Sequence, residues 1–139
     1  MRFLLHTNVL SEARKGPRAN PGVIAWLQAT PASTLWTSVL VLGELRRGIE
    51  SLRRRDPVAA ALLDRWLSDQ RAVQAGRILP VDEAVAARWG VLNVPDPLPT
   101  VDGLLAATAL VHGMTLVTRN TKDVLRTGAS LHNPFTPAA

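Results

Sequence analysis

Cysteine and tyrosine are both absent from this 139-residue sequence, which has only two phenylalanines and four tryptophans. Without cysteine the chain can form neither a disulfide framework nor a thiolate metal site, which fits a reducing, cytoplasmic environment. So few aromatic rings argue against a base-stacking platform for single-stranded nucleic acid. No apolar run approaches the length of a membrane span, and Leu5 is followed at once by the polar His6-Thr7-Asn8, which is not a signal-peptide layout. We therefore expect a cytoplasmic protein that does not use a membrane.

Lysine is nearly absent: the sequence has only Lys15 and Lys122, beside 14 arginines. The 16 basic and 11 acidic residues give a formal net charge of +5. The planar arginine fork suits phosphates and carboxylates, so the excess favours nucleic acid or an acidic protein as partner, although a GC-rich genome would also encode arginine for lysine. The length predicts one domain spanning residues 1–139, large enough to bury about two-thirds of its unfolded surface.

Short apolar runs alternate with amphipathic segments along the whole chain. We expect strands at 2–5, 34–37, 77–79 and 115–118, with a final short strand near Leu131. Capping residues predict helices from about Asn8, at 20–29, after Ser38, at 56–75, at 82–92 and at 100–112, with Gly113 as the last stop. This alternation is typical of an α/β fold, in which helices cover both faces of a parallel sheet.

Acidic and amide side chains recur where these elements meet. Glu44 borders the apolar stripe of its helix, and Asp102 lies in the first turn of the helix that follows the proline-rich loop 95–99. Asn120 and Asp123 follow the strand at 115–118. Taken singly, Glu44 is a solvated glutamate, Asp102 an N-terminal cap, and Asn120 the cap of a short helix.

Their joint placement favours a shared site, because the carboxyl ends of parallel strands meet at one rim of a sheet. Gathered carboxylates repel one another unless a cation neutralises them, and oxygen ligands suit Mg²⁺ or Mn²⁺. Such an ion can activate water and stabilise a phosphoryl transition state, while arginines hold the phosphates. We therefore expect a metal-dependent nuclease site.

Five segments carry a resemblance to a known family: FLLHTNVLSE, SVLVLGELRRGI, RILPVDEAVAARWG, PTVDGLLAATALVHGMTLVTRNTKD and LHNPF. In this order, over nearly the whole length, they resemble the PIN domain of VapC-type toxins, close to the FitB-like branch. The resemblance implies a single PIN domain over 1–139, a three-layer α/β/α sandwich with a central parallel sheet, and a Mg²⁺-dependent endoribonuclease acting on RNA of the tRNA or rRNA class. It also implies a VapB-like antitoxin, a homodimer, a heterotetramer or hetero-octamer with the antitoxin, and contact with operator DNA only through the antitoxin.

Carried over residue by residue, the resemblance implies that Glu44, Asp102 and Asp123 are metal ligands and that Asn8 orients the site. Whether Asn120 or Asp123 is the fourth site residue stays open, although only Asp123 is an acid.

The departure from the family pattern is His6, which stands where the pattern has an aspartate as central metal ligand. Neutral imidazole is a poor ligand for Mg²⁺. We expect His6 to converge with Glu44, Asp102 and Asp123, to be protonated by their negative charge, and to act as an internal cation. This substitution predicts a chain that folds but is nearly inactive on RNA.

Two other functions compete with this hypothesis. A binding-only protein would act solely through its antitoxin complex and would show little affinity for Mg²⁺. A phospho-receiver domain also gathers acids at strand ends, but it needs a lysine after a late strand, and Lys122 lies on a turn instead. For the antitoxin we expect a groove formed by the helix of Trp26 and Leu27 and by the Arg46-Arg47 end, whereas residues 53–55 form a solvated helix end or an RNA-facing patch.

Overall fold

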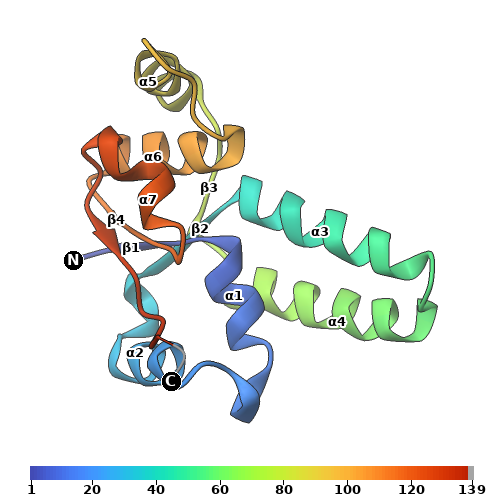
Figure 1. The fold of residues 1–139 in the computed structure, drawn as a ribbon. Coiled ribbons are helices and arrows are strands. Elements are labelled where there is room, and N and C mark those ends of the chain that lie inside the picture. The colour runs from blue at the N-terminus through green and yellow to red at the C-terminus, as the bar shows by residue number, and fades with distance from the viewer. Residues whose placement is uncertain (138–139) are drawn as a thin grey trace.

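The computed structural model describes residues 1–137. Its centre is a five-stranded sheet in the order β3-β2-β1-β4-β5, in which all the neighbouring strands are parallel. Figure 1 shows α5, α6 and α7 on one side of the sheet and α2 on the other. The predicted three-layer α/β/α sandwich is confirmed. The strands are β1 (Phe3–Leu5), β2 (Leu35–Ser38), β3 (Ile78–Leu79), β4 (Thr115–Val117) and β5 (Leu131–His132).

The helices begin at the capping residues that the sequence indicates. Side-chain oxygens of Asn20, Ser38, Asp56 and Asp82 accept backbone N–H groups of the first turn of α2, α3, α4 and α5. The last long helix, α6, ends at Gly113, whose φ of +64° is the left-handed stop expected there. The helices are α1 (Thr7–Ala13), α2 (Pro21–Ala29), α3 (Val39–Arg53), α4 (Pro57–Val73), α5 (Glu83–Leu92), α6 (Thr100–His112) and α7 (Thr121–Val124). None of these described helices is long and apolar enough to cross a bilayer.

Strand β1 is the middle of the sheet and of the core. Its residues pair in register with β4, from Phe3 opposite Thr115 to Leu5 opposite Val117, so the predicted adjacency of these two strands is confirmed. Leu4 and Leu5 are almost completely buried, and small buried residues of α6 allow that helix to approach the sheet closely. Because β1, β2 and β4 run in the same direction, their carboxyl ends lie at one rim.

The chain end after β5 is fastened to the start of α2. The side chain of Asn20 accepts the backbone N–H of Thr136 at 2.9 Å and donates to the carbonyl of the same residue at 2.9 Å. A Cβ on Gly22 would fall on the carbonyl oxygen of Pro134 and on Thr136, so the close approach requires glycine there. The terminal LHNPF segment is therefore built into the α2 layer.

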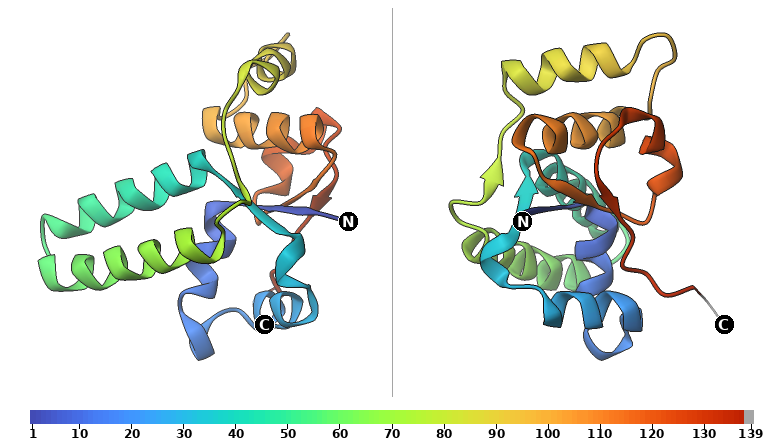
Figure 2. Two further views of the ribbon diagram at one scale, coloured as in Figure 1. Left: turned by 180° about the vertical axis from the view of Figure 1, so that it is seen from behind. Right: turned by 90° about the vertical axis from the view of Figure 1, so that its left-hand side faces the viewer.

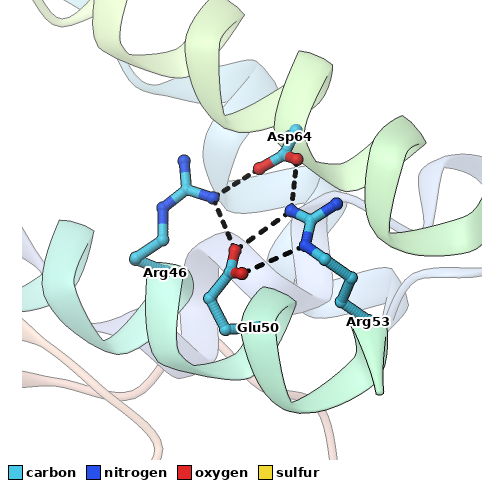
Figure 3. A network of polar contacts seen from close by, with 4 residues as sticks. All are labelled: Arg46, Glu50, Arg53 and Asp64. Atoms are coloured by element: carbon cyan, nitrogen blue, oxygen red, sulfur yellow. Dashed lines mark hydrogen bonds and ion pairs between the residues drawn. The ribbon is translucent and has the colours of Figure 1, made fainter. Parts of the chain in front are cut away.

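Helices α3 and α4 form a hairpin that projects from the rim (Figures 1 and 2), and a four-residue ionic network joins them (Figure 3). Arg46 and Arg53 of α3 both bind Asp64 of α4 and Glu50 of their own helix. The guanidinium of Arg53, followed by that of Arg46, lowers the pKa of both Glu50 and Asp64 by hydrogen bonding. The network is exposed, so solvent and salt screen it.

We predict that replacing Asp64 with asparagine lowers the melting temperature at neutral pH and that the loss disappears in acid. The pKa of Asp64 in the folded protein lies below its ordinary value of 3.8, so the stabilisation is fully present above that value and is lost as the pH falls through the folded pKa. Thermal melts of both proteins at several pH values, and at high salt, measure this. Asp69→Asn changes an exposed aspartate of the same helix outside the network and should have little effect at any pH. An Asp64→Asn deficit that persists unchanged in acid would exclude the electrostatic explanation.

Candidate functional site

His6 is the first residue beyond β1 and is 7% exposed. Its backbone N–H donates to Val117 O of β4 at 3.0 Å, which extends the strand pairing by one residue. Its Nδ1 accepts the backbone N–H of Asn8 at 3.2 Å, so the imidazole caps α1. Its Nε2 lies 2.8 Å from Oδ1 of Asp102 in the first turn of α6. His6 therefore connects β4, the start of α1 and the first turn of the buried helix α6.

These contacts assign the tautomer of a neutral His6 ring. In the neutral ring, Nδ1 accepts the N–H of Asn8, and Nε2–H is then the group that donates to Asp102. This use of the ring as a helix cap is a contact that the sequence reasoning did not foresee. The expectation that His6 is a protonated internal cation stays a prediction. A neutral imidazole satisfies both neighbours without a buried cation.

Glu44 reaches the same rim through a neighbour that the sequence analysis did not single out. Thr7 Oγ1 donates to Oε1 of Glu44, which lies in the second turn of α3. Both residues are partly buried. The two residues after β1 thus contact two acids from distant helices, since His6 binds Asp102 and Thr7 binds Glu44. A hydroxyl residue directly after a strand end was the available signal for Thr7.

Asn8 connects α1 to the loop that follows β4. Its Nδ2 donates to Thr118 Oγ1 at 3.4 Å, and its Oδ1 accepts the N–H of Arg119 at 3.3 Å. The buried Thr118 hydroxyl also accepts the N–H of Asn120 at 3.0 Å. Asn8 therefore holds the loop after β4 in place, while its predicted orienting role at the site stays a prediction. Thr118 is a further residue of this rim that sequence reasoning missed.

Asn120 and Asp123 lie on this loop and on α7, and the side chains of both are exposed. Asn120 begins α7, but its side chain makes no capping hydrogen bond there. Among residues 1–137, no three histidine, aspartate or glutamate side chains lie close enough together to hold a metal ion. The structure pairs His6 with Asp102 and Thr7 with Glu44, and it does not gather Glu44, Asp102 and Asp123 around His6.

The residues as they stand do not fit a magnesium ion. Mg²⁺ requires a compact octahedron of oxygen ligands. At this rim an N–H of His6 points at one Asp102 oxygen, and the Thr7 hydroxyl occupies one Glu44 oxygen. The metal-ligand role of Glu44, Asp102 and Asp123 remains a prediction from the family resemblance.

A groove of about 260 Å³ lies beside this rim, between α1 and the α3–α4 hairpin. Thr7 and Glu44 line the end of the groove nearest the rim. Arg14 and Arg55, which follow the ends of α1 and α3, also line it. Its apolar lining consists of Leu45, Ile49, Leu52, Leu63 and Trp66.

This groove is not composed of the residues expected from the sequence. Trp26 packs edge-on against Phe3, with ring centroids 5.1 Å apart, and also contacts His132. Leu27 lines a separate hollow between α1 and α2, and Arg46 belongs to the ionic network. Trp26, Leu27 and Arg46 are therefore not found in the lining of one common hollow among the described residues. That their helices form part of an antitoxin groove stays a prediction.

The parallel sheet, with helices on both faces, is the architecture of a PIN domain, and the family model for the PIN domain matches residues 3–128. The chain belongs to this family. It is 33% identical to Toxin FitB of Neisseria gonorrhoeae, over 96% of this chain and 98% of that protein, and 31% identical to VapC ribonuclease Y4jK of Sinorhizobium fredii, over 98% and 99%. A solved structure of FitAB bound to the IR36 DNA fragment contains a chain that superposes with a TM-score of 0.86 at 31% identity, covering 99% of this chain and 98% of that one.

We predict that His6→Asp lowers the melting temperature in a chelating buffer and that Mg²⁺ or Mn²⁺ restores part of the loss. Aspartate caps a helix well, so the substitution preserves the start of α1 while it replaces the donor to Asp102 with a second carboxylate. Because Asp102 loses its buried hydrogen-bond donor, the free energy of unfolding should fall by about 1–3 kcal/mol. Thermal melts with and without divalent ion measure both effects.

His6→Asn is the matched control, because asparagine also caps helices but adds no charge, and it should not respond to the ion. The chain with His6 should not respond either. Stabilisation of the His6 chain by Mg²⁺ equal to that of His6→Asp would show that the site takes the ion as it stands.

Proposed function

We propose that this chain is the toxin-type subunit of a type II toxin–antitoxin pair, derived from a metal-dependent endoribonuclease, and that His6 impairs its hydrolysis of RNA. The observation that carries the proposal is the 2.8 Å hydrogen bond between His6 and Asp102 at the position where the family pattern has an aspartate. The full-length similarity to a toxin and to a ribonuclease supports the class.

The chemistry of the rim explains the impairment. Both ring nitrogens of His6 are engaged, one by Asn8 and one by Asp102, so His6 offers neither an oxygen ligand nor a free basic nitrogen. A divalent ion in a PIN nuclease would supply water activation and charge neutralisation at the phosphate. Replacing one acid by a neutral imidazole removes one negative charge and one oxygen ligand from the set that would bind it.

We predict that His6→Asp raises Mg²⁺- or Mn²⁺-dependent cleavage of RNA by at least about 10²–10³-fold over the chain with His6. Initial rates on a labelled mixture of tRNA and rRNA fragments, with each ion and with chelator, measure the gain. The double variant His6→Asp with Asp102→Asn should lose it, which excludes a contaminating ribonuclease. Cleavage by the unmodified chain at the rate of His6→Asp would refute the impairment.

The second candidate function, binding without catalysis, draws support from the same bond and from the neighbouring groove. The FitAB structure is a complex, and we propose that this chain likewise binds a VapB-like antitoxin. The groove between α1 and the α3–α4 hairpin supplies an apolar surface for an amphipathic segment of that antitoxin. The homodimer, the larger assemblies and contact with operator DNA through the antitoxin remain predictions.

We predict that Leu52→Glu weakens binding of the antitoxin encoded beside this chain by about tenfold or more, because it places a charge among the apolar side chains of the groove. Titration of labelled antitoxin measures the affinity, and circular dichroism verifies the fold. Leu62→Glu is the matched control, since Leu62 is 65% exposed on α4 and does not line the groove. Equal affinities for the two variants would place the antitoxin elsewhere.

A further inference from the structure

Three cationic side chains gather where α1 ends. Arg14, Lys15 and Arg18 line a hollow of about 440 Å³, and among the described residues no other side chain lines it. The gathering depends on the turn: Gly16 adopts a φ of +62°, and the following 3₁₀ helix, Gly16–Arg18, returns Arg18 beside Arg14. In Figure 1 this turn is the blue segment below α1, on the way to α2.

The positive charge of this hollow is only partly balanced. Lys15 pairs with Glu12 at 3.0 Å, but within residues 1–137 neither Arg14 nor Arg18 has a carboxylate in ion-pair distance, and both are exposed. Arg46 and Arg53, by contrast, are held by Glu50 and Asp64. The helix dipole of α1 favours a cation at its C-terminal end, where Arg14 is the capping residue, but Arg18 lies farther on, in the following 3₁₀ helix. Neighbouring cations that no carboxylate neutralises favour the binding of an anion from solution.

Arg14 lies between the hollow and the groove beside the candidate site, because it lines both. This groove is the one lined by Thr7 and Glu44, and Arg55 lines it from the end of α3. A strand bound at the hollow would therefore be directed along the groove toward the rim. The groove also contains Trp66, whose ring is partly buried.

We propose that the hollow of Arg14, Lys15 and Arg18 binds the phosphodiester backbone of a nucleic acid strand and leads it toward the rim of His6 and Glu44. A guanidinium group can bind two phosphate oxygens at once, and Arg14 and Arg18 have no carboxylate partner among residues 1–137. An acidic peptide fits this hollow less well, because peptides dock through apolar anchors and no apolar side chain of residues 1–137 lines it. That the nucleic acid is RNA rests on the proposed function, the ribonuclease origin of this chain. Binding of the strand itself does not require cleavage.

Fluorescence anisotropy in a chelating buffer tests this with the chain as it exists, using a labelled single-stranded RNA of mixed sequence and a duplex DNA of equal length. The double variant Arg14→Gln with Arg18→Gln should bind the RNA at least roughly fivefold more weakly, and the slope of log K against log salt should shrink by about 1.4, or about 0.7 for each lost phosphate contact on a single strand. The matched control is Arg65→Gln with Arg88→Gln, which removes the same charge from exposed positions on α4 and α5 and should change binding less than twofold.

Equal loss in the two double variants would mean that only net charge matters and would overturn the proposal. Competition by polyglutamate as effective as that by unlabelled RNA would overturn it as well, since the surface would then be a general anion surface. Preferential loss of duplex DNA binding would support the phosphodiester site and identify a duplex as its ligand. Because every arm is measured without divalent ion, a failure here is distinct from a failure of the His6→Asp cleavage experiment.

Discussion

The constraint on which the structure depends is the position of a three-residue strand. β1 lies between β2 and β4, so its residues are buried on both faces and its carboxyl end is surrounded by other elements. His6 directly follows that end, and it must satisfy a strand, a helix start and a carboxylate at once. Any polar group placed there without partners would carry the desolvation cost of a buried donor or acceptor, about 1–3 kcal/mol. The neutral imidazole meets the requirement because it has one acceptor and one donor nitrogen.

Most of the fold could be predicted because its signals are local. The caps at Asn20, Ser38, Asp56 and Asp82 and the stop at Gly113 are short-range patterns, and the buried runs identify the strands to within about one residue. Other features depend on side-chain directions in three dimensions. These are the hydrogen bond between Thr7 and Glu44, the hydrogen bonds between Asn20 and Thr136, and the different contacts made by Trp26 and by Arg46. Sequence spacing does not encode these directions between elements that are far apart in the chain.

The candidate site shows the same division. The pairing of His6 with Asp102 follows from the topology, since both residues occupy the rim at which parallel strands end. The capping contact of His6 did not follow, because the sequence does not show that the N–H of Asn8 lies 3.2 Å from Nδ1 of the ring. Asp123 was expected beside this pair from its place after a strand end and from the family resemblance, and it lies exposed on α7.

The arrangement also separates chemistry from binding. His6 and Asp102 form a pair beside the core, whereas the groove lies between α1 and the α3–α4 hairpin, and the cationic hollow lies at the turn after α1. Thr7 and Glu44 are the residues common to the rim and the groove. Under the functions proposed above, a change at His6 would alter the rim and would leave the groove and the hollow unchanged. Aspartate at the same position would keep the cap of α1 but would leave two carboxylates facing each other, so in a PIN domain the acid that serves hydrolysis opposes stability until a cation arrives. The imidazole avoids that repulsion, because it donates a hydrogen bond to Asp102 in place of a second carboxylate.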